Sequence, residues 1–390
     1  MNDLEAPRQR HALALVAIMA IAASGPPQVD GWTIPVPEGT RIVEYPAPSI
    51  ADRRGNRIDL VQDLVIGPRG NDANYLFYRP SAIRVDDEGR IYVADSGSSR
   101  VQIFDADGEY LGTLGRGGQG PGEFGGGGLS RPLGLLVAGE RVVVGDPSQR
   151  KIAVFASSGA HIADHAVSGS LLTGLADGSF LGAFNERDDE GSLYQRLARL
   201  SAEGEQLHSY LSLPVPPRQR VGNFVGIPGA TPAPSFAASR AGEIYATGGD
   251  EYQVVAIDVS GVARWALRVA WKREPFTEEH ENGVLSWLEE LSPDDAVATG
   301  TDWPTQLPAL SGLAVDGHGH LYVFPFEFGF GETGEEREVD VYSRDGERLF
   351  TGHMDRALWL DARGDFVYSL RTNEETGELE PVRYRLVEPF

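Results

Sequence analysis

The sequence contains no cysteine and only eight histidines among its 390 residues. The absence of cysteine excludes disulfide bonds, thiol nucleophiles, cysteine-ligated zinc and a lipid-modified N-terminal cysteine. A small exported domain without disulfides would be difficult to stabilise, but a chain of this length can fold by burying its core alone. The scarcity of histidine limits the places where a metal site or a general base could be built.

Positive charge is also scarce. Lysine and arginine together number 34 against 57 aspartates and glutamates, and the net charge is -23. An acidic surface of this kind repels phosphodiester backbones and anionic lipid headgroups. We therefore expect no nucleic-acid partner.

Long apolar runs are absent except near the N-terminus. Arg8 and Arg10 precede an apolar run at 12–23, and small residues follow it from Ser24. About 20 apolar residues are needed to span a bilayer, so this shorter run fits the hydrophobic region of a secretory signal. We predict a signal peptide over 1–24, export to the periplasm or the extracellular space, and no membrane insertion after cleavage. A buried N-terminal helix is the alternative.

The chain repeats itself at a spacing of about 51 residues. The segment GRIYVADSGSSRVQIFDADG at 89–108 aligns with residues 140–159 and, three spacings away, with residues 242–261. Weaker copies begin at residues 175, 313 and 358. Together these copies make six units, which is the pattern expected of a repeat architecture.

Each unit has the pattern of four short β-strands joined by tight turns. Apolar and polar residues alternate in segments such as VQIF at 101–104, which is typical of a strand with two unlike faces. The pair Asp107-Gly108 supplies the positive φ that a tight hairpin needs. Four antiparallel strands in about 40 to 50 residues indicate one propeller blade. We predict an all-β fold, a six-bladed β-propeller of four-stranded antiparallel blades over 57–390.

An additional strand is expected before the first unit. The segment RIDLVQDLVIG at 57–67 has a strand pattern, whereas the last unit ends after three strands. A ring of blades closes when one terminus completes the blade begun by the other, so we expect 57–67 to complete the last blade. Residues 25–56 are then an N-terminal extension.

One segment has a helical pattern. Within 277–295, Val284, Trp287, Leu288 and Leu291 recur at the spacing that places them on one helix face. We predict a short helical insertion here. It either packs on its own blade or acts as a lid over one mouth of the channel.

The segment 79–124 resembles the NHL-repeat family of six-bladed propellers, and especially its exported bacterial members. The family places an aspartate at the end of the second strand and an arginine or lysine at the start of the third. Asp95 with Arg100, and Asp146 with Lys151, match this pattern. We interpret Asp95 and Arg100 as a structural ion pair, with ligand binding as the alternative. Some intracellular NHL proteins bind RNA, but the acidic composition argues against that role here.

A glycine-rich segment has the glycine spacing of a dinucleotide-binding loop. Gly115, Gly117 and Gly120 have the G-x-G-x-x-G spacing of such loops. A dinucleotide loop needs a helix directly after its glycines. Pro121 and a glycine run at 125–128 follow instead, so we interpret this segment as a crossover between two blades.

By analogy with other propellers, the first strand of each unit should line the central channel. The six predicted inner strands contain neither histidine nor carboxylate; they are residues 81–85, 133–137, 171–176, 235–239, 311–315 and 357–360. His318 and His320 fall in a turn, and we interpret them as surface residues. We therefore predict no catalytic residue, no metal and no cofactor.

Arginines precede several inner strands. Arg79 and Arg131 hold matching positions, Arg356 lies near the equivalent place, and Tyr78 and Phe124 nearby would add apolar contact area. A guanidinium group suits a carboxylate or a phosphate. We predict that these five residues bind ligand at the channel mouth on the crossover-loop face. The alternative is that each arginine pairs with a neighbouring acid.

These observations predict a non-catalytic β-propeller of the cell envelope that binds a ligand or a protein and is monomeric. The partner would be a protein, a glycan or a small anion. The alternative is an enzyme similar to the metal-dependent propeller lactonases and lyases, with its metal in the channel. A structural role in an envelope assembly is a third interpretation.

Overall fold

The computed structural model describes most of the chain beyond its N-terminal segment; the described residues are 33–70, 72–125, 133–167, 169–215, 220–221, 224–225, 234–291, 303–329, 336–357, 359–373 and 376–390. The predicted signal peptide, residues 1–24, lies outside them. No helix in the described ranges has the length and apolar character to cross a membrane.

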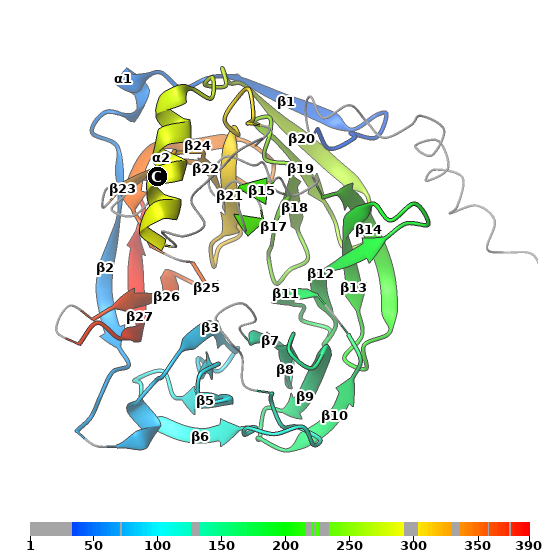
Figure 1. Ribbon diagram of the computed structural model, residues 1–390, viewed down its shortest axis with the longest axis vertical. Coiled ribbons are helices and arrows are strands. Elements are labelled where there is room, and N and C mark those ends of the chain that lie inside the picture. The colour runs from blue at the N-terminus through cyan, green and yellow to red at the C-terminus, as the bar shows by residue number, and fades with distance from the viewer. Residues whose placement is uncertain are drawn as a thin grey trace, which may run out of the picture.

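Antiparallel sheets arranged around a common axis make up the fold, as Figure 1 shows along that axis. The first, second and third sheets are four-stranded, and within each the strands follow one another in chain order. The strands of the first sheet are β3 (Pro80–Val85), β4 (Ile91–Asp95), β5 (Arg100–Phe104) and β6 (Tyr110–Leu114). Those of the second are β7 (Gly134–Ala138), β8 (Arg141–Asp146), β9 (Lys151–Ala156) and β10 (His161–His165). Those of the third are β11 (Ser170–Gly174), β12 (Phe180–Arg187), β13 (Leu193–Leu200) and β14 (Gln206–Pro214).

The fourth sheet gains a fifth strand from the N-terminal side of the chain. Its own strands are β17 (Ser235–Ala238), β18 (Ile244–Thr247), β19 (Gln253–Ile257) and β20 (Ala263–Ala270). Strand β1 (Arg41–Pro46) lies parallel to β20 at the outer edge. A separate two-stranded ribbon, β15 (Arg220–Val221) and β16 (Phe224–Val225), precedes this sheet.

The remaining strands form one eight-stranded sheet, which differs from the separate four-stranded blades that the sequence predicts. One half contains β21 (Leu310–Val315), β22 (Leu321–Pro325), β23 (Glu336–Tyr342) and β24 (Arg348–Asp355). The other contains β25 (Asp361–Arg363), β26 (Phe366–Thr372) and β27 (Leu379–Val387). Strand β2 (Arg57–Val65) joins the halves, because its start pairs parallel with β24 and the rest pairs antiparallel with β27.

Apolar side chains pack between neighbouring sheets rather than at the axis. One buried cluster, with Tyr92, Phe124 and Phe155, joins the first and second sheets. Another, with Trp265 and Tyr342, joins the fourth sheet to β21–β24. Middle strands such as β4 are buried along their whole length because a sheet lies against each of their faces. This packing leaves the first strands facing the axis.

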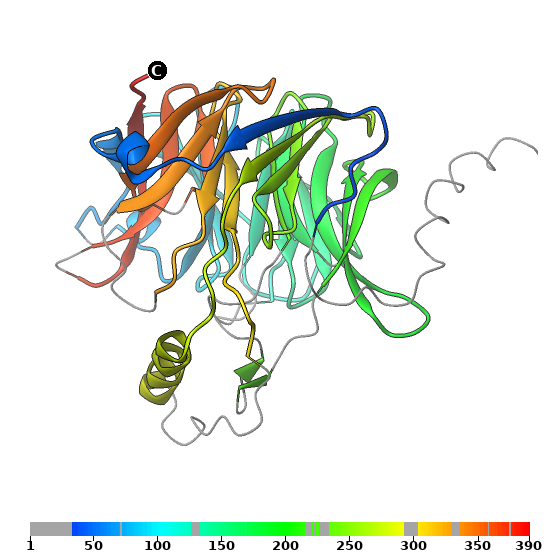
Figure 2. The ribbon, with the colours of Figure 1, turned by 90° about the horizontal axis from the view of Figure 1, so that it is seen from above.

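Two short helices accompany the N-terminal side, α1 (Ile50–Arg53) and the 3-10 turn η1 (Ala73–Tyr75). The longer helix α2 (Glu278–Leu291) lies off one face of the ring, as Figure 2 shows. Val284 and Leu288 are buried against Leu307, with Trp287 partly buried beside them. The side chain of Leu291 lies outside the described residues. The apolar stripe therefore packs on the segments that flank the helix.

Candidate functional site

A cavity of about 780 Å³ lies on the axis of the ring, and we call it the axial cavity. First strands supply much of its wall, including Arg84 of β3, Leu172 of β11, Phe236 of β17, Leu313 of β21 and Asp361 of β25. Its rim is formed by turns that join first to second strands, at 87, 239–241, 316–317, 319 and 363–364. Next to the last of these turns, the carbonyl of Asp365 accepts the N–H of Leu386 in the C-terminal segment, at 2.8 Å. The mouth therefore lies on the face that carries the C-terminus, opposite α2 (Figure 2).

Arg84 crosses the axis. Its Nη1 donates to the carbonyl of Ile83 at 2.7 Å and to that of Leu360, and its Nη2 donates to the carbonyl of Leu172 at 3.3 Å. These carbonyls belong to strands of different sheets or to the residue that precedes one. Burial lowers the pKa of the Arg84 guanidinium, and the charge of Asp361 acts in the opposite direction. The side chain thus ties inner strands together across the channel.

Asp361 corrects one sequence prediction. We expected the last inner strand at 357–360 and no carboxylate on any inner strand, but β25 begins at Asp361. The apolar residues before Asp361 have the sequence pattern of a strand. In the structure, Trp359 precedes β25 and packs on the ring of Tyr322, with centroids 4.6 Å apart. The Oδ2 of Asp361 accepts the N–H of Val85 at 2.7 Å. Burial raises the pKa of Asp361, and Arg84 opposes this.

A charged bridge spans the mouth of the cavity. The Oδ1 of Asp87, in the turn between β3 and β4, lies 2.6 Å from Nη2 of Arg363 and 3.5 Å from Nη2 of Arg240. Arg240 also donates through Nη1 to the carbonyl of Val85 at 2.6 Å. The first sheet, the fourth sheet and β25 are therefore linked by one carboxylate.

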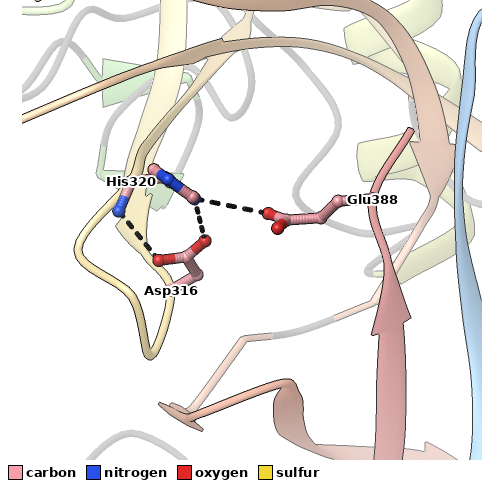
Figure 3. A group of neighbouring side chains, drawn as sticks. All are labelled: Asp316, His320 and Glu388. Atoms are coloured by element: carbon pink, nitrogen blue, oxygen red, sulfur yellow. Dashed lines mark hydrogen bonds and ion pairs between the residues drawn. The ribbon is translucent and has the colours of Figure 1, made fainter. Parts of the chain in front are cut away.

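Asp316, His320 and Glu388 form a second group of titratable residues, drawn in Figure 3. His320 Nδ1 lies 2.8 Å from Oδ2 of Asp316 and 3.6 Å from Oε1 of Glu388. The potential ligand atoms of the three all lie within 4.8 Å of one another, a spacing that could hold a metal ion. The neighbouring His318 pairs instead with Asp365, with Nε2 and Oδ1 2.8 Å apart.

The first sheet shows what this group does in the fold. At the corresponding turn, Oδ2 of Asp86 lies 2.6 Å from Nε of Arg90 and accepts the hydroxyl of Tyr92 at 2.9 Å. Asp86 and Asp316 each accept two turn N–H groups through Oδ1. Arginine cannot ligate a metal because it has no acceptor atom. Arg90 holds the position in the first sheet that corresponds to His320. Both side chains bind the aspartate of their turn and stabilise it, so this structural role accounts for the positions of Asp316 and His320 without a metal.

Burial is the main cause that raises the pKa of Glu388. Its Oε1 accepts the hydroxyl of Tyr322, the residue that corresponds to Tyr92. The C-terminal segment is thereby held against β22, and the group fastens the end of the chain to the turn.

The predicted ligand-binding residues that the structure describes lie away from the axial cavity. Tyr78 and Arg79 precede β3 and lie together, with the Arg79 guanidinium carbon 5.5 Å from the Tyr78 ring centroid. The Tyr78 side chain is exposed, at 74%. Arg131 lies outside the described residues. Tyr78 and Arg79 are absent from the described wall of the axial cavity.

The other two predicted residues have separate surroundings. Arg356 follows β24, pairs with Glu327 and donates to the carbonyl of Glu336 at 3.3 Å. Phe124 is fully buried, and its ring centroid lies 6.1 Å from that of Phe155. The structure thus brings Tyr78 and Arg79 together and places Arg356 and Phe124 elsewhere. A ligand-binding role for this set remains a prediction.

The aspartates of the NHL pattern have structural partners. Asp95 is buried, accepts the backbone N–H of Arg79 at 2.8 Å, and lies 3.8 Å from Nε of Arg100. Lys151, in contrast, pairs with Asp164 at 2.9 Å. Asp146 accepts backbone N–H groups, including that of Gly125 at 2.7 Å.

Sequence reasoning missed the charged groups of the axial cavity, namely Arg84, Asp87, Arg240, Asp361 and Arg363. Arg84 offered a signal, because it is the one charged residue in the inner strand SAIRV. The turn residues offered none, since charged residues are ordinary in turns.

Comparisons with known proteins give one family match. Residues 77–104 match the family model of the NHL repeat. No curated protein matches the chain.

Several solved structures are similar to this chain along most of its length. One is a Bacteroides fragilis protein whose name assigns it to the exported proteins. Its sequence is 12% identical, the alignment covers 89% of this chain and 98% of that one, and the TM-score is 0.45. A member of the DUF4221 family from Bacteroides vulgatus is 13% identical, with coverages of 85% and 99% and a TM-score of 0.46. An inactive virginiamycin B lyase from Staphylococcus aureus is 10% identical, with coverages of 83% and 88% and a TM-score of 0.38. Similarity at this level assigns no function to the chain.

Proposed function

We propose that the chain is an exported, six-bladed NHL-repeat β-propeller that binds a ligand in the axial cavity without catalysing a reaction. The match of residues 77–104 to the NHL repeat supports the family. Six blades follow if the eight-stranded sheet is counted as two, with β2 completing the set of β25–β27. The six sequence units support this count. Export rests on the apolar run at 12–23.

The axial cavity is the observation that carries the proposal. Its volume of about 780 Å³ falls within the range of about 300 to 1,000 Å³ that is usual for small-molecule sites. Apolar side chains from several sheets and a few charged groups share its wall, which is the usual composition of a binding site. A ligand held on the axis would contact several blades at once.

The contacts of the charged groups favour binding over catalysis. Arg84 is engaged by three carbonyls, and Asp361 accepts the N–H of Val85. No histidine occurs among the described residues that line the cavity. A general base must be free to take a proton from a bound substrate, whereas Asp361 accepts a backbone N–H and Asp87 is paired with Arg363 and Arg240. The partner is a small anion, a glycan or a protein segment, and the propeller acts as a monomer.

Filling the cavity tests this function. Ala314→Phe and Ala362→Phe place a ring in the wall, whereas Ala106→Phe adds the same ring at an exposed turn and serves as the control. Thermal shifts would be measured against a panel of organic anions, sugars and short peptides. A ligand at one hundred times its Kd stabilises the folded state by about 2.7 kcal/mol. We expect this gain in the wild type and in Ala106→Phe, and its loss in both cavity variants.

Three results would contradict the proposal. A stabilising ligand that acts equally on the cavity variants binds elsewhere, for example at Tyr78 and Arg79. A ligand that is chemically converted on incubation, as measured by mass spectrometry, would establish an enzyme. Stoichiometric metal retained after dialysis would support the metal-dependent alternative.

A further inference from the structure

We infer that the mouth of the axial cavity is an anion site in which the carboxylate of Asp87 occupies the place of a ligand's anionic group. The inference rests on the proposed function and specifies its ligand as a small organic carboxylate or phosphate with an apolar body. On binding, the ligand anion would replace Asp87 between Arg240 and Arg363.

Asp87 is suited to displacement. Both guanidinium groups contact the same oxygen of Asp87, at 2.6 Å for Arg363 and 3.5 Å for Arg240. The Asp87 side chain is 64% exposed, whereas those of Arg363 and Arg240 are 32% and 28% exposed. An exposed ion pair contributes little stability, so its carboxylate can leave at small cost. Water would solvate the released Asp87 side chain.

Arg240 is held in place without Asp87, and the backbone of Arg363 is fixed by its strand. Arg240 donates to the carbonyl of Val85 at 2.6 Å, which fixes its guanidinium at the mouth. The backbone of Arg363 lies in β25, so the sheet fixes the point from which its side chain reaches Asp87. Two guanidinium groups that converge on one point bind carboxylate or phosphate oxygens with charge-assisted hydrogen bonds.

The charge of the described wall favours an anion locally, although the whole chain carries -23. The wall contains four arginines and three aspartates; these are Arg84, Arg240, Arg344 and Arg363, with Asp87, Asp316 and Asp361. Release of Asp87 into water leaves four positive groups against two negative ones. Arg344 contributes less, because it donates to the carbonyl of His318 at 2.9 Å and lies 3.6 Å from Glu243.

The apolar side chains of the wall indicate that the uncharged part of the ligand is aromatic or aliphatic. Leu172, Phe236, Leu313 and Trp359 offer apolar surface below the mouth. A molecule with an anionic end and an aromatic or aliphatic body would place its charge between the arginines and its body against these side chains. A highly charged polyanion would lose water without apolar contacts in return.

Isothermal titration calorimetry with benzoate, phenyl phosphate and the neutral benzyl alcohol tests this arrangement. Arg363→Gln should weaken binding of both anions by about tenfold, because one charge-assisted contact is lost. Asp87→Asn should strengthen it by about fivefold, because the internal competitor is gone. The control Glu88→Gln changes the net charge equally, but Glu88 pairs with Arg90, with oxygen and nitrogen 2.9 Å apart. Its effect on anion binding should therefore be smaller.

Several outcomes would overturn the inference. Equal gains in Asp87→Asn and Glu88→Gln would show that only long-range charge matters. Benzyl alcohol bound as tightly as benzoate would show that the arginines do not select an anion. If neither anion binds the wild type or Asp87→Asn at millimolar concentration, while the cavity-filling variants still abolish binding of another ligand, the inference fails and the proposed function stands. The relative affinities of benzoate and phenyl phosphate separate a carboxylate site from a phosphate site.

Discussion

In the first sheet, buried carboxylates bind partners that are close in the sequence. Asp95 accepts the N–H of Arg79, 16 residues away, and Asp86 pairs with Arg90 four residues on. In the β21–β24 half of the eight-stranded sheet, the buried Asp340 binds Arg53, 287 residues away, and Tyr252, 88 residues away. Both regions have the same strand order, and in each the turn aspartate, Asp86 or Asp316, is bound by a residue four positions on. The second buried carboxylate differs, because Asp95 is bound locally and Asp340 by distant segments.

This difference explains where the repeat can be recognised. A local ion pair requires a fixed spacing of residue types, so the first sheet keeps the NHL pattern, and the family match falls at 77–104. In β21–β24 the position corresponding to Asp95 is Pro325, and the charged contacts come from the N-terminal segment instead. That segment contributes α1 and β2, which lie where the two halves of the eight-stranded sheet meet.

The largest effect is expected from Arg53→Met. Arg53 is 4% exposed and Asp340 is fully buried, with Arg53 Nη1 3.0 Å from Oδ1 of Asp340. Removing one member of a buried ion pair leaves an uncompensated charge and costs about 3 to 5 kcal/mol. Urea unfolding would measure the loss, with the exposed neighbour variant Arg54→Met as the control. Equal losses in the two variants would mean that the distant ion pair does not fasten this region.

A smaller loss is expected from Asp95→Asn. Its carboxylate accepts the N–H groups of Tyr78 and Arg79, and an amide leaves one of them without an acceptor. A buried unsatisfied group costs about 1 to 3 kcal/mol. Amide hydrogen exchange should show faster exchange in the first sheet alone, whereas Arg53→Met should affect the eight-stranded sheet. The exposed Asp107→Asn serves as the control, and identical exchange maps for the two buried variants would contradict the distinction between local and distant fastening.

Exchanging the two turn braces should have a still smaller effect. Arg90→His and His320→Arg each keep a donor for the aspartate of the turn, so we expect the free energy of unfolding to change by about 1 kcal/mol or less. Urea unfolding of both variants measures this. If Asp316, His320 and Glu388 instead form a metal site, His320→Arg would abolish metal binding that the wild type shows by calorimetry with Zn²⁺ or Ca²⁺.

The sequence predicts the local parts of the fold well. The Asp107-Gly108 turn has the expected positive φ, at +81° for Gly108. The helix expected within 277–295 is observed at Glu278–Leu291. Each of these features depends on residues within a few positions of one another, where spacing determines the geometry.

Contacts across the ring could not be predicted in the same way. Arg240 reaches the carbonyl of Val85, 155 residues away, only because the sheets meet around one axis. Arg84 is visible in the sequence, but its role depends on the carbonyls of Leu172 and Leu360. Strand β2 pairs with both β24 and β27 and so joins two repeat units into one sheet. This pairing also depends on the closed ring, which places β24 and β27 on either side of β2.

The smallest effect concerns pH and tests how Arg53 acts on its second partner, Glu338, whose Oε2 lies 3.2 Å from Nε of Arg53. Burial raises the pKa of Glu338 above its usual 4.5, and Arg53 opposes this rise. The folded state therefore binds this proton more tightly than the unfolded chain. The resulting stabilisation is complete below about pH 4.5 and is lost as the pH rises through the folded pKa.

Glu338→Gln removes this pH dependence of the free energy of unfolding. The stability of the variant relative to wild type should therefore rise across that pH interval, by less than about 1 kcal/mol because the carboxylate is partly solvated. Urea unfolding at a series of pH values measures the slope. In the Arg53→Met background the slope should be steeper, because the opposing charge is absent, and a shallower slope there would show that Arg53 does not act on Glu338.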